Sequence, residues 1–190
     1  MMNSKRRIEN EWQTLKEVAK GDSRAFRTLY MHYYDRLFQF AMLFLRSETG
    51  AEDVVADVFF NIWKDRTTLT GIPNFQAYIY QAVRYGCLNV LKSGYVSKRS
   101  DLPEIEMQVT IAPDSPLDEL AYKELSDAVQ QAVNALPERC RMVFKMSRED
   151  EMSQQEIADA LGVQLCTVQR QTLLAKAKIK QAIEPFLEKK

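Results

Sequence analysis

The segment from Ser153 to Lys180 limits the fold of this chain more than any other, because it contains a helix start, a helix end and a second helix. Ser153 and Glu156 form the Ser-x-x-Glu pattern, in which each side chain satisfies a backbone N–H group of the other residue. Gly162 directly follows the apolar position Leu161, where a left-handed helix end favours a residue without a Cβ atom. The pattern therefore predicts two helices joined by a tight turn.

The second helix of this segment has one apolar face, made by Val168, Thr172, Ala175 and Ile179, that we expect to pack inward. Residues 163–183 hold four cations and no acid, which suits the phosphates beside a major groove. We therefore expect this helix to bind duplex DNA, although a helical hairpin that closes a bundle would show the same apolar face. The candidate duplex contacts are Cys166, Thr167, Gln169, Arg170, Gln171, Leu173, Leu174, Lys176 and Lys178.

The composition predicts a mostly helical, soluble protein, with 46% hydrophobic and 27% charged residues and only 6 Gly and 6 Pro in 190 residues. The formal net charge is zero, so DNA binding without a partner should be weak. The charge is nevertheless segregated: residues 101–127 hold eight acids and one lysine, whereas residues 84–99 hold four cations and no acid. This segregation indicates either a chain that folds back on itself or a basic partner.

Several classes of protein are disfavoured. No apolar run approaches the ~18 residues of a membrane span, and no apolar segment follows the N-terminal basic cluster, so we expect a cytoplasmic protein that does not insert into membranes. The three cysteines are widely spaced and His32 is the only histidine, which argues against a metal site and for reduced thiols. No phosphate-binding glycine loop or nucleophile and base motif is present, so we expect neither an enzyme nor a cofactor.

The first half of the chain contains two informative helices. Asp22 or Ser23 should begin a helix that runs to about Leu45, and its many aromatic residues are interpreted as core. The next helix, about residues 51–65, has an apolar half, but Phe60 lies among acids on the opposite half. An exposed phenylalanine between carboxylates is typical of a protein-binding surface, unless another part of the chain covers it. The candidate residues of this surface are Asp53, Ala56, Asp57, Phe60 and Asn61.

A loop with Gly71 and Pro73, predicted over residues 67–75, is followed by a helix that ends near Lys92. Aromatic rings, amides and cations on this helix suit single-stranded DNA, because bases stack on rings, amides bind base edges and cations bind phosphates. The candidate residues are Asn74, Tyr78, Arg84, Tyr85, Asn89 and Lys92. From residue 93 to residue 119 there is no helical periodicity, and acids and prolines predominate, so this stretch is interpreted as a flexible linker.

The order of these parts resembles the extracytoplasmic-function (ECF) group of bacterial RNA polymerase sigma factors. The resemblance rests on GDSRAFRTLYMHYYDRLFQFA, AEDVVADVFFNIW, FQAYIYQAVRYGCLNVLK, ALPERCRMVF and MSQQEIADALGVQLCTVQR. It implies an all-α chain of two small helical domains joined by a flexible acidic linker. Residues 10–92 would bind core RNA polymerase and the minus-10 element, residues 93–119 would be the linker, and residues 120–187 would read the minus-35 element with a helix-turn-helix.

The resemblance also assigns roles to the candidate residues. The face from Asp53 to Lys64 would bind the clamp helices of the polymerase, and the 67–75 loop with Tyr85 and Asn89 would take flipped bases of the minus-10 element. The whole chain would be an alternative-type sigma factor that directs promoter-specific initiation and is held inactive by an anti-sigma factor. Two other hypotheses remain open: a sigma-like protein that titrates an anti-sigma factor without binding DNA, and a helix-turn-helix repressor that dimerises through its helical domain.

Overall fold

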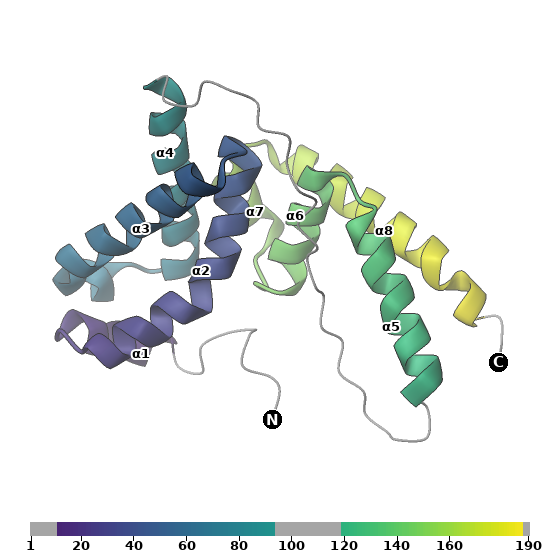
Figure 1. The fold of residues 1–190 in the computed structure, drawn as a ribbon, viewed down its shortest axis with the longest axis horizontal. Helices are drawn as coiled ribbons and strands as arrows, with labels where there is room; N and C mark the ends of the chain where they lie inside the picture. Colours follow the sequence, from purple (N-terminus) through teal and green to yellow (C-terminus); the bar gives the residue numbers. More distant parts are fainter. Residues whose placement is uncertain (1–10, 94–118, 188–190) are drawn as a thin grey trace.

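The computed structural model describes residues 11–93 and 119–187, of which residues 119–124 and 187 are described by their backbone alone, and all regular structure in these ranges is helical (Figure 1). The elements are α1 (Glu11–Ala19), α2 (Ser23–Leu45), α3 (Glu48–Lys64), the 3-10 helix η1 (Arg66–Gly71), α4 (Phe75–Lys92), α5 (Glu119–Asn134), α6 (Glu138–Arg148), α7 (Gln154–Leu161) and α8 (Leu165–Leu187). The predicted all-α class is confirmed. Most of the predicted acidic linker, residues 94–118, lies outside the described residues.

Local capping explains where several helices begin and end. The Asp22 carboxylate accepts hydrogen bonds from the backbone N–H groups of the first turn of α2, and Ser47 does the same for α3. Ser153 and Glu156 form both bonds of the capping box at the start of α7, and Gly162 ends that helix in the left-handed conformation, with φ 66°. The helix-turn-helix prediction is confirmed in its cap, its turn and its second helix.

The predicted loop over residues 67–75 needs a correction. Residues 66–71 form the 3-10 helix η1, which packs against α1, and only the short stretch from Ile72 to Asn74 is irregular. The reason is Leu69, which is only 2% exposed because it packs into the core. Gly71 and Pro73 therefore mark the end of a packed turn and the entry into α4.

The first half of the molecule, residues 11–93, packs α1 to α4 around α2. Leu29, Leu37 and Phe40 of α2 are fully buried, as are Val55 of α3 and Ile79 of α4. Of the aromatic residues on α2 that were interpreted as core, Tyr33 and Phe40 are buried, whereas five others pack half-buried at the edge of the core: Phe26, Tyr30, Tyr34, Phe38 and Phe44. Aromatic side chains thus seal the core against solvent as well as fill it.

The second half, residues 119–187, is arranged around the long helix α8, with α5 and α6 alongside it (Figure 1). Val168 and Ala175 of α8 are fully buried and Thr172 is 9% exposed, so the inward face predicted for this helix is confirmed, with Ile179 half-buried at its end. The Thr172 hydroxyl donates to the Val168 carbonyl oxygen, which satisfies this polar group inside the core.

The larger of two hydrophobic clusters spans both halves, and the smaller one, Leu136, Cys140 and Ala175, lies within the second half. Met146 of α6, Met152 and Ile157 belong to the same buried cluster as the residues of α2 and α4. Helix α7 packs against α4, and α6 touches α2. The second half is thus docked on the first through α7, and we call this packing of α7 on α4 the docked arrangement.

Candidate protein and nucleic-acid interfaces

The outward face of α3 is open to solvent. Phe60 is 66% exposed, and Asp53, Ala56, Asp57 and Asn61 are exposed beside it. The opposite side of the helix is buried through Val54, Val55, Val58, Phe59 and Ile62. The predicted exposure of Phe60 is confirmed, and no described part of the chain covers it. An uncovered aromatic ring among carboxylates is suited to bind another protein.

A pocket of about 410 Å³ lies between α3 and α4 and connects two sets of predicted residues. Asp57 and Asn61 of α3 line one side, and Tyr78, Tyr85 and Asn89 of α4 line the other. Both tyrosines are exposed, Tyr78 by 42% and Tyr85 by 58%, so their rings can stack on a planar ligand. Residues chosen for protein binding and for base binding therefore meet at one site.

Two of the residues predicted to bind the minus-10 element contact the helix-turn-helix. The Asn74 side-chain oxygen accepts the backbone N–H of Ala77 at 2.9 Å and so caps α4, while its amide nitrogen donates to the Glu156 carboxylate. The Arg84 guanidinium lies so close to Gly162 that a Cβ atom at that glycine would overlap it. Gly162 is thus required both for its left-handed backbone and for this close approach.

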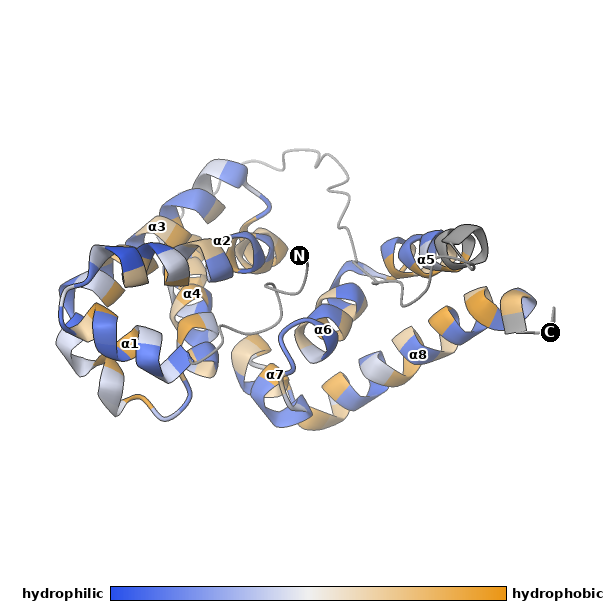
Figure 2. Ribbon diagram, turned by 90° about the horizontal axis from the view of Figure 1, so that it is seen from below, coloured by the Kyte–Doolittle hydropathy of each residue, from blue (hydrophilic) through white to orange (hydrophobic). Residues whose placement is uncertain are grey.

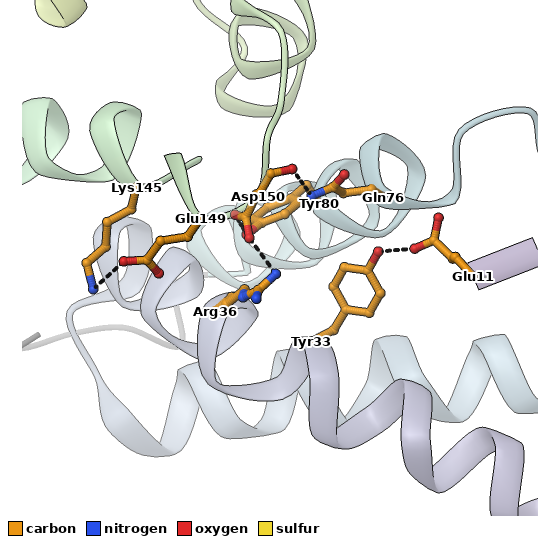
Figure 3. Close-up of polar contacts among 8 residues, drawn as sticks. All are labelled: Glu11, Tyr33, Arg36, Gln76, Tyr80, Lys145, Glu149 and Asp150. Atoms are coloured by element: carbon orange, nitrogen blue, oxygen red, sulfur yellow. Dashed lines mark hydrogen bonds and ion pairs between the residues drawn. The ribbon is translucent and has the colours of Figure 1, made fainter. Parts of the chain in front are cut away.

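Asp150, in the turn between α6 and α7, is the centre of the contact between the halves (Figure 3). One carboxylate oxygen lies 2.7 Å from Nη1 of Arg36 on α2, and the other accepts the Tyr80 hydroxyl of α4 at 2.6 Å. The Asp150 carbonyl oxygen accepts the side-chain amide of Gln76 at 2.8 Å. The carboxylate is thus buried with a cation and a hydroxyl from two other helices.

Burial is the largest influence on the titration of this site. It raises the pKa of Asp150 above its usual value, while the nearby Arg36 and the Tyr80 hydrogen bond act in the opposite direction. The pKa of Tyr80 is also raised well above its usual value by burial and by the Asp150 charge, so its hydroxyl keeps its proton and donates it. Sequence reasoning missed Asp150, because nothing near it in the chain distinguishes it from the neighbouring acids Glu149 and Glu151.

The outward face of α8 carries most of the predicted duplex contacts. Thr167 and Gln171 are half-buried, and the other seven candidates are exposed: Cys166, Gln169, Arg170, Leu173, Leu174, Lys176 and Lys178. Leu173 is 68% exposed and Leu174 50% exposed, so apolar side chains interrupt the cationic surface. Figure 2 shows that hydrophobic and hydrophilic residues alternate along the ribbon of α8. The predicted orientation of Arg170 away from the core is confirmed.

The described residues also bear on the metal and membrane predictions. Over residues 11–93 and 119–187, no three or more histidine, cysteine or acidic side chains gather as metal ligands would. Cys87 and Cys140 are buried and Cys166 is exposed, and all three are free thiols. None of the helices in this part of the chain combines the length and the apolar character that a membrane span needs.

Comparison with known proteins identifies two sigma-factor regions. Residues 29–95 match the family Sigma-70 region 2, and residues 126–179 match Sigma-70, region 4. The RNA polymerase sigma-H factor of Pseudomonas aeruginosa is 22% identical over an alignment of 190 residues, gaps included. The alignment covers 94% of this chain and 96% of that protein. The ECF RNA polymerase sigma factor SigW of Bacillus subtilis is 26% identical over 161 residues, or 81% of this chain and 86% of that protein.

A third relative and one solved structure complete the comparison. The ECF RNA polymerase sigma-E factor of Escherichia coli K12 is 23% identical over 182 residues, covering 92% of this chain and 95% of that protein. The structure of CnrH in complex with the cytosolic domain of CnrY covers 92% of this chain and 97% of that chain, at 21% identity and a TM-score of 0.50. This likeness shows that the two chains share a fold.

Proposed function

Because the chain belongs to the ECF group of RNA polymerase sigma factors, we propose that it recruits core RNA polymerase to the promoters of a small set of genes. The observation that carries this proposal is the pair of outward surfaces. The first half has an uncovered aromatic and acidic face on α3, and the second half has an uncovered face with cations on α8. One chain with both surfaces can bind core RNA polymerase and promoter DNA at the same time.

The first half, within residues 10–92, would bind the clamp helices of the polymerase through Phe60 and its neighbours. A large aromatic residue that is exposed before binding and buried afterwards is a common source of affinity in protein interfaces. The adjoining pocket, between Tyr78 and Asn61, would then take unpaired bases of the minus-10 element. Polymerase and single-stranded DNA would therefore meet on neighbouring surfaces.

The second half, within residues 120–187, would read the minus-35 element as a duplex, with α8 in the major groove. Arg170 is exposed and on the outward face, where a guanidinium can donate two hydrogen bonds to a guanine. Leu173 and Leu174 would contact thymine methyl groups or a partner protein. Residues 93–119 would span the distance between the two DNA elements.

The mechanism is binding and positioning. Sigma factors are regulators and not enzymes, and we assign no catalytic residue, cofactor or metal to this chain. With a formal net charge of zero, the chain lacks a long-range attraction to DNA, so contacts with polymerase must supply the affinity. The place of action is the cytoplasm, where promoter DNA and polymerase are found.

Control by an anti-sigma factor is part of the proposal. CnrH, whose structure covers 92% of this chain, was solved in complex with the cytosolic domain of CnrY, which supports a partner of that kind for this chain as well. The exposed apolar residues Phe60, Leu173 and Leu174 are the surfaces that such a partner would cover.

Replacing Arg170 separates this function from the alternative of a sigma-like protein that titrates an anti-sigma factor. Arg170→Ala should abolish promoter-dependent transcription by core polymerase while its binding to core polymerase, measured by pull-down, stays unchanged. Arg27→Ala, which removes an exposed arginine from α2, is the matched control and should leave transcription intact. Full transcription by Arg170→Ala would contradict the proposed reading of the minus-35 element.

A further inference from the structure

The outward face of α8 combines an arginine with two apolar side chains. Val168 and Ala175 are fully buried, and they fix the rotation of the helix about its axis. At ~100° per residue, Leu173 and Leu174 then lie within ~60° of Arg170, one on each side of it. All three side chains are exposed. The centre of the outward face is thus an arginine with a leucine on either side.

Two lysines of α8 lie on the flanks of this face. Lys176 and Lys178 are exposed, and at the same helical spacing they lie on opposite sides, further round the helix than the leucines. A helix in the major groove has base edges in front of it and a phosphate backbone on either side. The lysines are therefore placed for phosphates, which carry no direct sequence information, whereas the leucines and Arg170 are placed for base edges.

A leucine against a base edge distinguishes A·T pairs from G·C pairs. Its methyl groups can pack on the 5-methyl group of thymine, which projects into the major groove. Against a G·C pair, the same side chain would cover polar atoms of the base edges and leave them without hydrogen-bond partners, which costs free energy. Leu173 and Leu174 thus favour thymine by contact and disfavour G·C pairs by the loss of hydrogen bonds.

The spacing along α8 lets these side chains contact one short element. The helix rises ~1.5 Å per residue, so Arg170 and Leu174 are ~6 Å apart along its axis, which is about two base-pair steps. A guanine bound by Arg170 and the thymines beside the leucines would therefore lie next to one another in the sequence.

We propose that Leu173 and Leu174 read the duplex element of this chain through thymine methyl groups, and that the thymines lie within about two base pairs of the guanine bound by Arg170. The inference rests on the proposed function, because it takes α8 to be the helix that reads the minus-35 element. It goes further by giving the chemical group that determines the sequence. The flanking lysines favour DNA, because phosphates pair with them while the leucines are covered.

Replacing thymine by deoxyuridine removes the methyl group and keeps the base pairing. The probe is a synthetic promoter duplex whose upstream element is the sequence shared by the genomic fragments that the wild-type holoenzyme selects. One copy carries thymine in that element and the other carries deoxyuridine. The holoenzyme, formed from core polymerase and the full chain, should bind the thymine copy roughly 4-fold more tightly for each contacted methyl group. Competition binding gives the ratio of the two affinities.

The double variant Leu173→Ala with Leu174→Ala shows whether the leucines make this contact. Its ratio of thymine to deoxyuridine affinity should fall toward 1. The control Lys176→Ala should weaken the binding of both duplexes equally and keep the wild-type ratio, because a phosphate contact does not depend on the methyl group. Both leucines are exposed, so the double variant should keep its helical circular dichroism. A ratio that stays at the wild-type value in the folded double variant would overturn the proposal.

The wild-type ratio alone also tests the inference and separates it from the proposed function. Specific binding of the holoenzyme to both copies with equal affinity would overturn the thymine contact, assign the leucines to a partner protein and leave the proposed function standing. A holoenzyme that selects no genomic fragment would contradict the proposed function, and the inference would fall with it.

Discussion

The outward faces of α3 and α4 are adjacent, but they differ in how much of each is exposed to solvent. On α3, Phe60 and all four of its predicted neighbours are exposed, whereas on α4 and its cap Asn74 and Arg84 contact α7 while Tyr78 and Tyr85 remain open. The surface that we propose for polymerase is open in the free chain, and the surface that we propose for single-stranded DNA is partly covered. If these assignments are correct, the polymerase surface is available without a rearrangement, whereas Asn74 and Arg84 must first leave their contacts with Glu156 and Gly162.

The largest effect should come from the α3 face. Phe60→Ala removes the exposed ring and should weaken binding to core polymerase by roughly 30-fold, or about 2 kcal/mol, as expected for an aromatic anchor at the centre of an interface. The thermal midpoint should stay the same, because the ring is 66% exposed. Binding is measured by fluorescence titration with core polymerase.

Met31 provides the control for this variant, since it is also apolar, also 66% exposed and lies on α2. Met31→Ala should bind core polymerase as the wild type does. Equal losses of affinity in both variants would show that general apolar exposure, and not the α3 face, governs the binding.

A smaller effect is expected at the turn that approaches α4. Gly162→Ala places a Cβ atom both in the left-handed region and on the Arg84 guanidinium, and should lower the free energy of unfolding by about 1–2 kcal/mol from the backbone strain alone. Gly71→Ala is the control, because nothing lies within 4 Å of a Cβ atom there. Urea unfolding of both variants gives the comparison.

The combination of Gly162→Ala with Arg84→Ala tests the docked arrangement more sharply. If Arg84 lies against Gly162 in solution, part of the loss should disappear in the double variant, because the overlap has been removed. Strictly additive losses would mean that the two residues do not touch.

The capping box of α7 should contribute next. Ser153→Ala removes the hydroxyl that accepts the Glu156 N–H at 3.2 Å and should lower the free energy of unfolding by about 1 kcal/mol. Ser23→Ala is the matched control, since Ser23 is exposed and lies beside the Asp22 cap rather than at it. A loss confined to Ser153→Ala would show that the helix covering α4 depends on its own cap.

The smallest effect should be a pH dependence at His32 on α2. Burial, and secondly the nearby Arg36, lower the pKa of His32 from 6.5 to about 4. Below pH 6.5 the unfolded chain therefore gains a proton that the folded ring does not take up, and the stability due to neutral His32 is lost as the pH falls toward 4. Since the ring is partly exposed, solvent screening reduces the size of this loss.

The measurement compares the free energy of unfolding of the wild type with that of His32→Gln between pH 7 and 4. As the pH falls, the wild type should lose free energy of unfolding relative to His32→Gln. The raised pKa of Asp150 acts in the opposite direction, because the docked carboxyl holds its proton more strongly, but it is present in both proteins and cancels. A pH-independent difference would show that His32 does not titrate in this way.

The features that were predicted correctly from the sequence depend on residues that are close to one another in the chain. The Asp22 and Ser153 caps, the Gly162 turn and the exposure of Phe60 follow from residues within one or two helical turns, so their patterns could be read directly. Asp150 differs because its Tyr80 partner is 70 residues away in the chain. Only the packing of α7 on α4 brings them together, and no local pattern encodes that packing.

The loop before α4 illustrates the same limit on a smaller scale. Gly71 and Pro73 predict a break in the chain, and the break is present, but Leu69 packs into the core and pulls residues 66–71 into a 3-10 turn. Gly71 and Pro73 were enough to predict where the turn lies, whereas its conformation depends on the contact with α1. The assignment of polymerase and promoter contacts to particular residues remains a prediction.

The most direct measurement is run-off transcription of fragmented genomic DNA by core polymerase, with and without this chain, followed by sequencing of the transcript ends. The account predicts starts that appear only with the chain and that share two upstream sequence elements about two helical turns apart. Those starts should become weaker with Phe60→Ala and disappear with Arg170→Ala. Transcription that does not change when the chain is added would contradict the assignment of this protein as a sigma factor.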